Sequence, residues 1–379
     1  MNKYILFELD HGGPTNIILA FKFLVYIAYI TNRILIIPPS KSIYHYDWGP
    51  NGLNESTNKF ENLTKTNLID IINLKEFKKL IKIVSFDEFY NLEKENLKLM
   101  DNFNNFHQLY SDYDTMNIQG NRLKNKEEKN RGLYWINMAN YLSNIKIKYK
   151  KNNDWIIFSK NKFKTIKLKK KNIHDSLYFL TKIKKLNENV IYLPMDINFL
   201  TKEYKYPRIF MYAANFETND KMWEKINSLQ YLNNKFYKIA NIIIKKYLSD
   251  GNYDALHWRY NGFNERKEYN GTKILNMIQK NIKSGNLYIS TDSYDKIFKN
   301  IDKSKYEFKI FSVKIMEEFK NEINKKDIPF IEQLICAKSN IFVGTNISSF
   351  SSEILNIRTK KLNCFRKLKD LQDSKNYFI

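Results

Sequence analysis

The pattern of apolar and polar positions in the first forty residues predicts a strand, a helix and a second strand. An apolar run over 4–9 leads into a turn with two glycines and a proline, after which 16–32 carry apolar groups on most sides of a helix. The run 34–37 then stops at two prolines. Strand, helix and strand in this order form a βαβ unit, which implies a parallel sheet with ligands beyond the carboxyl ends of its strands.

Strand patterns and helix patterns alternate again in the second half of the chain, which predicts another doubly wound α/β domain. The expected strands are 255–259, 287–290, 308–313 and 341–344, and the expected helices are 272–283, 294–300, 330–337 and 348–357. Two such domains that face each other across a cleft would hold a nucleotide-bearing ligand between them.

Domain bounds follow from these patterns and from shifts in composition. We expect an N-terminal domain over 1–248, with a polar insertion at about 91–131, and a C-terminal domain over 249–358. We expect the tail, 359–379, to pack back on the N-terminal domain. A long helix over 221–248 closes the first domain in this interpretation.

The charge of the chain names a class of partner but no particular one. It has 63 basic and 40 acidic side chains in 379 residues, a net charge of +23. Such a field attracts nucleic acid, anionic membranes and phosphorylated small molecules alike. Residues 144–171 alternate lysines with apolar groups, which predicts half-buried strands. Their lysines are either an anion or nucleic-acid patch or a solvated strand face.

Several classes of function lose support because their motifs are missing from the sequence. It contains no GxxxxGK[ST], HExxH, GxSxG or GxGxxG pattern, its five histidines are scattered, and two cysteines build no disulfide framework. We therefore expect no metal and no cofactor. The apolar stretch 17–30 is shorter than the roughly 20 residues of a membrane span, and no signal peptide is recognisable at the N-terminus. We expect a cytoplasmic protein without a transmembrane segment.

Polar residues follow three strands of the second domain. Arg259, two residues after His257, is suited to bidentate phosphate contact, although a surface salt bridge and a structural histidine explain the pair equally. Gly344 and Thr345 lead to Ser348 and Ser349 at a helix N-terminus, where free amides hold an anion while Ser348 caps the helix.

The remaining candidates of this domain concern a nucleoside. Phe350 stacks on a base or fills the core. A ribose diol or the donor pair of guanine calls for a carboxylate, which Asp292 or Glu332 would supply. Capping of a helix is the alternative role of Asp292.

Taken together, these segments resemble the protein O-fucosyltransferases and their relatives. Four motifs occur in the family's order. They are Gly12-Gly-Pro-Thr-Asn16 with Asn32-Arg-Ile-Leu-Ile-Ile-Pro-Pro39, then His257-Trp-Arg259, Tyr288-Ile-Ser-Thr-Asp292, and the stretch 331–350 that closes with Arg358. The likeness covers the first forty residues and about 255–358.

The resemblance implies a GT-B architecture and a metal-independent, inverting transfer of fucose from GDP-fucose. It implies that Arg259 contacts the diphosphate and that Asn16 lies near the fucose and the acceptor. The other donor-binding residues that it implies are Gly12, Gly13, His257, Asp292, Glu332, Thr345, Ser348, Ser349 and Phe350.

Two departures from the family pattern bear on the acceptor. Some relatives carry a glutamate in the glycine loop that acts as base, and Gly13 stands at that place here. Asp10 or Glu8 would substitute, or no side-chain base is used. The arginine segment continues Asn261-Gly-Phe263, without the acid that often follows.

Three functions stay open at this point. The first is a fucosyltransferase whose acceptor is protein Ser/Thr or a glycan, with no stable nucleic-acid partner. The second is a GT-B transferase for another nucleotide sugar. The third is a basic nucleic-acid-binding protein without catalysis, whose binding would weaken steeply with salt.

Overall fold

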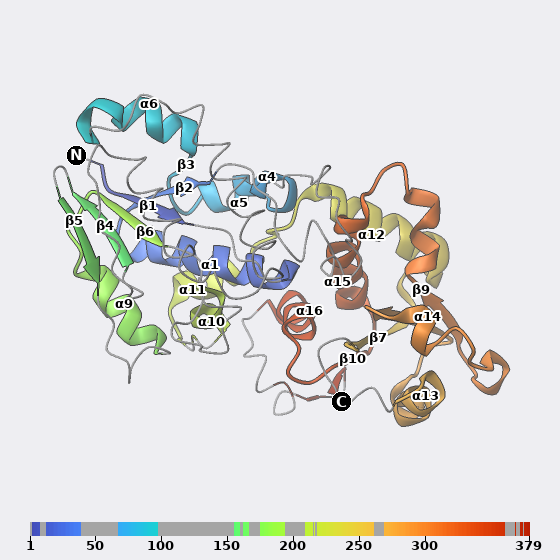
Figure 1. The fold of residues 1–379 in the computed structure, drawn as a ribbon. Coiled ribbons are helices and arrows are strands. Elements are labelled where there is room, and N and C mark those ends of the chain that lie inside the picture. Colours follow the sequence, from blue (N-terminus) through green and yellow to red (C-terminus); the bar gives the residue numbers. More distant parts are fainter. Residues whose placement is uncertain are drawn as a thin grey trace, which may run out of the picture. The chain divides into compact units, whose positions relative to one another are not determined.

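The computed structural model divides the chain into two compact units, Met1–Ile226 and Asn227–Ile379 (Figure 1). It describes residues 2–7, 13–38, 67–97, 155–159, 162–166, 175–193, 209–214, 216, 218–260, 269–360, 368, 372–373 and 375–379. Among these residues no helix is long and apolar enough to cross a membrane.

The N-terminal unit is built on a six-stranded sheet of order β3-β2-β1-β6-β4-β5. Its strands are β1 (Tyr4–Phe7), β2 (Ile34–Ile37), β3 (Ile83–Ser85), β4 (Trp155–Ser159), β5 (Lys162–Ile166) and β6 (Val190–Leu193). The first three strands and β6 run parallel, whereas β4 is antiparallel to both of its neighbours. Because the chain leaves β1 toward β2 and later returns to its other side at β6, the strand order reverses beside β1, which is where α/β sheets bind ligands.

Helix α1 (Pro14–Ile30) follows β1 and is the central helix of this unit. Its start fits the sequence, because Gly13 caps it in an extended conformation and proline takes the first helical position. The side chains of 17–28 are all buried, as a helix that is apolar on most sides requires. The other helices of the unit are α4 (Leu68–Ile71), α5 (Leu74–Lys78), α6 (Phe86–Leu97), α9 (Ser176–Lys184) and α10 (Ile209–Ala214), and α11 (Lys221–Ser228) spans the boundary.

The C-terminal unit has a five-stranded, fully parallel sheet of order β11-β10-β7-β8-β9. Its strands are β7 (Asp254–Trp258), β8 (Asn286–Thr291), β9 (Lys309–Ser312), β10 (Phe342–Gly344) and β11 (Asn376–Phe378). Its α-helices are α12 (Asn234–Tyr247), α13 (Gly271–Ile278), α14 (Tyr294–Ile297), α15 (Ile328–Lys338) and α16 (Ser349–Thr359). The order reverses between β7 and β10, so the carboxyl ends of these two strands form the switch point of the sheet.

One buried carboxylate fixes the opposite end of the same strands. Asp254, at the start of β7, accepts hydrogen bonds from the backbone amides of Lys283, Ser284 and Ile341 at 2.7, 2.8 and 2.9 Å. These amides directly precede β8 and β10, so the carboxylate aligns the starts of β7, β8 and β10 with one another. Every residue of β7 is buried, as expected for a central parallel strand.

The sequence patterns predicted most of these elements. The run 34–37 is β2, and each expected strand and helix of the second half matches an observed element within a few residues. Within 144–171 the structure describes two strands, β4 and β5, which pair antiparallel. Two doubly wound α/β units are confirmed.

Four predictions need correction. The helix expected over 221–248 is two helices, α11 and α12. The boundary lies at 226 and not at 248, because buried side chains of α12, such as Phe236, pack on Phe330 of α15. Residues 91–97, where we expected the polar insertion to begin, are the second half of helix α6, and 98–131 lie outside the described residues.

The fourth correction concerns the C-terminal tail. Its end forms β11, which pairs parallel with β10 in the C-terminal unit. Arg358 at the end of α16 holds this strand, because its Nε donates to the side chain of Asn376 at 2.7 Å.

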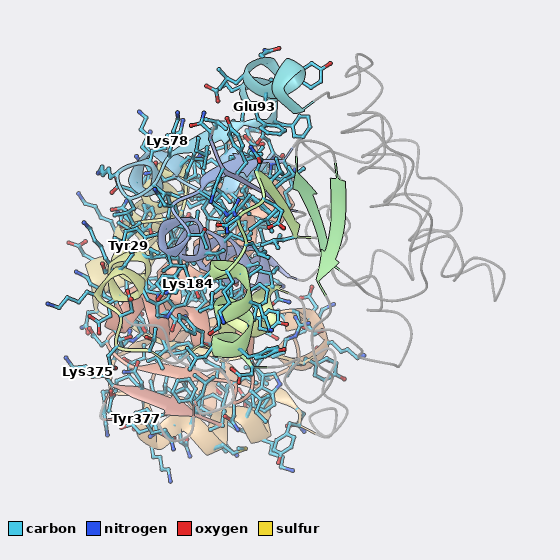
Figure 2. All side chains as sticks on the ribbon, turned by 90° about the vertical axis from the view of Figure 1, so that its left-hand side faces the viewer. Tyr29, Lys78, Glu93, Lys184, Lys375 and Tyr377 are labelled. Carbon is cyan, nitrogen blue, oxygen red and sulfur yellow. The ribbon has the colours of Figure 1, made fainter. Side chains whose placement is uncertain are left out.

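The surface of the chain carries exposed lysines. Figure 2 labels three of them, Lys78, Lys184 and Lys375.

Candidate functional site

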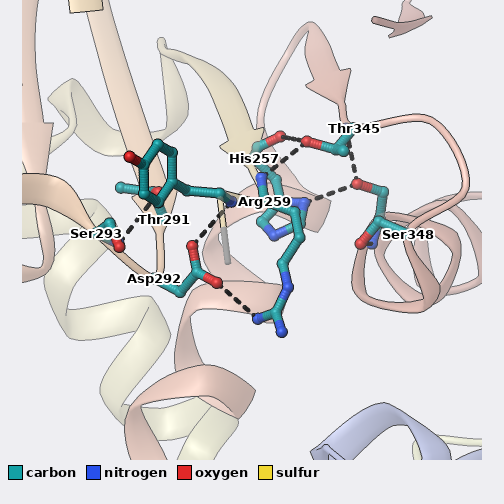
Figure 3. Close-up of polar contacts among 9 residues, drawn as sticks. His257, Arg259, Thr291, Asp292, Ser293, Thr345 and Ser348 are labelled. Carbon is teal, nitrogen blue, oxygen red and sulfur yellow. Dashed lines mark hydrogen bonds and ion pairs between the residues drawn. The ribbon is translucent and has the colours of Figure 1, made fainter. Parts of the chain in front are cut away.

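Arg259 lies one residue beyond the carboxyl end of β7, between the two neighbouring strands (Figure 3). Its backbone N–H donates to the hydroxyl of Thr345, which follows β10, at 2.9 Å. The next amide, of Tyr260, donates to Oδ1 of Asp292, which follows β8, also at 2.9 Å. The strand end that carries the arginine is therefore fixed from both sides at the switch point of the sheet.

The guanidinium of Arg259 is held as well. Its Nη1 lies 2.8 Å from Oδ2 of Asp292, with exposed side-chain fractions of 37% for the arginine and 11% for the aspartate. The salt bridge anticipated from the sequence is thus present. It uses part of a group that has five N–H donors, and more than a third of the side chain reaches solvent, so the arginine keeps the capacity to bind an anion.

His257 and Thr345 belong to a hydrogen-bonded network whose hub is Ser351. The Thr345 hydroxyl donates to the carbonyl of His257 at 2.8 Å, and the Thr345 amide donates to Oγ of Ser351 at 2.9 Å. The same Oγ lies 2.7 Å from Nδ1 of His257. Ser351 is fully buried and was not among the residues predicted from the sequence, although its place in the first turn of a serine-rich helix start was visible.

The N-terminus of α16 completes this edge. Ser348 caps the helix, since its Oγ accepts from the amide of Ser351 at 3.4 Å, so the expected cap is confirmed. The first turn of this 11-residue helix has backbone amides without intrahelical partners and a partial positive charge, which together bind anions. Ser349 and Phe350 are half-buried there, and the ring of Phe350 stacks on His257 with centroids 4.5 Å apart.

The two carboxylates proposed as nucleoside contacts have different surroundings. Glu332 on α15 is buried, and its Oε1 accepts from the hydroxyl of Tyr288 on β8 at 3.0 Å. Burial raises the pKa of Glu332 to about 8, and the nearby Asp292 acts in the same direction. Glu332 is therefore protonated at neutral pH, whereas Asp292 is paired with Arg259. The structure brings Asp292, but not Glu332, into direct contact with the arginine.

The predicted residues of the N-terminal unit are only partly described. Asn16 is half-buried in the first turn of α1, and its backbone N–H donates to the carbonyl of Gly13 at 2.9 Å. A Cβ added at Gly13 would meet nothing within 4 Å. Asp10 and Gly12 lie outside the described residues. Within the described part of the chain, no three His, Cys, Asp or Glu side chains gather as a metal site would require.

Two doubly wound units define the GT-B class of glycosyltransferase folds. Among solved structures, POFUT1 in complex with GDP is similar, with a TM-score of 0.51 and 11% identity over 100% of this chain and 99% of that chain. POFUT1 in complex with GDP-fucose has a TM-score of 0.50 and 12% identity, over 100% of this chain and 98% of that chain. At this identity the likeness establishes the fold.

The family follows from the sequence. The chain belongs to the GDP-fucose protein O-fucosyltransferase family, whose model matches residues 4–360. A curated relative, GDP-fucose protein O-fucosyltransferase 2 of Plasmodium berghei (strain Anka), is 31% identical over 144 residues. That match covers 36% of this chain and 30% of the relative. The resemblance drawn from four short motifs is confirmed.

Proposed function

We propose that this protein transfers fucose from GDP-fucose to a hydroxyl acceptor. The observation that carries the proposal is the strand end at the switch point of the C-terminal sheet. There the guanidinium of Arg259 is paired with Asp292, the backbone amide of this arginine is held by Thr345, and both lie at the same edge as the N-terminus of α16. The family and the fold of the chain support this assignment.

The chemistry explains why these groups belong together. Transfer breaks the bond between the anomeric carbon of fucose and the diphosphate oxygen, and GDP leaves with the electron pair. Negative charge grows on that oxygen, so donors that are already oriented toward it stabilise the transition state more than mobile ones. Arg259 and the amides of α16 are such donors. The stacked pair of Phe350 and His257 offers a surface for the guanine.

The acceptor oxygen attacks the opposite face of the anomeric carbon and loses its proton, so the configuration inverts. In our proposal Arg259 and α16 supply the positive charge at the diphosphate without a metal ion. We place Asn16 beside the fucose and the acceptor, with Asp10 as the side chain that accepts the proton. The acceptor is a hydroxyl of a protein or of a glycan.

Release of GDP from GDP-fucose, with water or an added hydroxyl as acceptor, tests the proposal directly. Arg259→Ala should lower turnover at least about 100-fold, the usual cost of losing one such donor, while its melting temperature stays near that of the wild type. Lys314→Ala is the matched control, because Lys314 is an exposed cation paired with Asp295 at 3.1 Å, and it should keep full turnover. Undiminished turnover in a folded Arg259→Ala protein would refute the assignment.

Ligand-induced thermal stabilisation separates the alternatives. We expect GDP to raise the melting temperature more than UDP and more than a single-stranded oligonucleotide of equal charge. A stabilisation by every polyanion that vanishes with added salt would instead favour the basic nucleic-acid-binding protein.

A further inference from the structure

We propose that Asp292 is a positioning residue that orients the guanidinium of Arg259, and that it does not bind the nucleoside. This inference rests on the proposed function and deepens it, because it assigns a task to the carboxylate beside the arginine. It also replaces the nucleoside role that the sequence resemblance implies for Asp292.

The register of the sheet explains why these two residues meet. Trp258 on β7 pairs with Thr291 on β8, so Arg259 and Asp292 are the next residues at adjacent strand ends. The chain turns directly after Asp292, where the amide of Ser293 donates to the Thr291 hydroxyl at 3.4 Å. In Figure 3 the carboxylate of Asp292 points toward the strand end of β7 and the guanidinium comes down to meet it.

Both oxygens of the carboxylate are engaged by consecutive residues of the same strand end. Oδ1 accepts from the amide of Tyr260 at 2.9 Å, and Oδ2 pairs with Nη1 of Arg259 at 2.8 Å. Tyr260 is itself buried, at 7% exposure, in a hydrophobic core cluster that also contains Leu256 and Trp258 of β7. The carboxylate is therefore tied to rigid backbone on one side and transfers that rigidity to a long, flexible side chain on the other.

Electrostatics favours positioning over ligand contact. A carboxylate that touched the donor near its diphosphate would repel it, and a ribose diol would compete for oxygens that Arg259 and Tyr260 already occupy. Behind the arginine, with only 11% of its side chain exposed, the same carboxylate removes the rotamer freedom that a long side chain otherwise loses when it binds. The remaining N–H groups of Arg259 stay available for the diphosphate.

A double-mutant cycle in GDP affinity tests the assignment, with Arg259→Ala, Asp292→Asn and the double variant. Asparagine keeps an oxygen for the Tyr260 amide but cannot accept from Arg259 as a carboxylate does. We expect Asp292→Asn to weaken GDP binding about ten-fold when Arg259 is present, the scale of a strongly coupled pair, and not to weaken it further in the Arg259→Ala background. Binding of GMP, which lacks the second phosphate, should change less than binding of GDP.

Turnover and a matched control complete the design. Asp292→Asn should lower kcat for GDP-fucose more than it raises KM, and Asp292→Glu should recover part of the loss because it restores the charge. Asp295→Asn removes the same charge three residues away, where the side chain is 70% exposed, and should leave kcat, KM and GDP affinity unchanged.

The outcomes distinguish the two proposals. A wild-type protein that neither binds GDP nor turns over GDP-fucose would overturn the proposed function. The positioning role would be overturned if the wild type binds GDP and turns over GDP-fucose, but Asp292→Asn still weakens GDP binding in the Arg259→Ala background and weakens GMP binding as much as GDP binding. Asp292 would then be assigned to binding the nucleoside.

Discussion

Glu332 should make the stability of this protein fall as pH rises through neutrality. Its pKa is about 8 in the folded protein, raised mainly by burial, against 4.5 for an exposed glutamate. At pH 6 the folded chain keeps this proton while the unfolded chain has lost it, so folding is favoured by proton binding. Raising the pH toward the folded pKa removes that contribution.

The size of the effect follows from the two pKa values. Each pH unit between them is worth about 1.4 kcal/mol, so about 2 kcal/mol of the free energy of unfolding is lost from pH 4.5 to 6 and about 2 kcal/mol more from pH 6 to 8. Glu332→Gln has no proton to lose and keeps an oxygen that accepts from Tyr288. We therefore expect the variant and the wild type to be about equally stable only below pH 4.5, and the variant to be more stable by about 2 kcal/mol at pH 6 and by about 5 kcal/mol at pH 9.

Urea unfolding of both proteins from pH 5 to 9 measures this difference, and groups that both proteins share cancel in the comparison. Tyr288 and Cys336 do not interfere, because burial raises the pKa of each well above its ordinary value in the folded protein. Parallel stability profiles for the two proteins would refute the reasoning. They would mean that the hydrogen bonds of Tyr288 and Ser290 keep the carboxylate ionised throughout.

Three further predictions concern positions where the structure separates fold from function. Gly344→Ala should lower the free energy of unfolding by about 1–3 kcal/mol, because the added Cβ would lie 2.8 Å from the ring of Phe378 on β11. Urea denaturation measures this loss, and an unchanged urea midpoint would contradict the contact. Gly13→Ala should leave the melting temperature unchanged, since space is open there and the backbone is extended, and any lost turnover would then come from the substrate side. Arg358→Lys should lower the free energy of unfolding by about 1–3 kcal/mol. One ammonium group cannot replace a guanidinium that donates to the Asn376 side chain at 2.7 Å and to the Ser339 carbonyl at 2.6 Å. Equal melting temperatures of the variant and the wild type would exclude this role.

The C-terminal unit was predictable because its chemistry is local. A parallel strand buried on both faces appears as a short apolar run, and the residues that serve a ligand come directly after such runs. Arg259, Asp292 and Thr345 each stand within two residues of a strand end. A reader of the sequence therefore finds the candidates without knowing which strands are neighbours.

What the sequence could not give is the order of the strands, and the partnerships depend on that order. Asp292 faces Arg259 because β8 lies beside β7, and the Thr345 hydroxyl reaches the arginine amide because β10 lies on the other side. Ser351 becomes a hub for the same reason. The tail was misplaced because three residues, Asn376–Phe378, carry too little pattern to show which sheet edge they join.

The net charge and the site act on anions in different ways, and the difference bears on selectivity. A charge of +23 draws any polyanion to the surface, where lysines such as Lys78 and Lys184 are exposed to solvent. Arg259 instead is paired with an acid, which weakens its long-range attraction but fixes its direction. Under the proposed function, selectivity for a diphosphate over other anions would therefore arise from the held geometry at this strand end, because a field that attracts all anions alike distinguishes none of them.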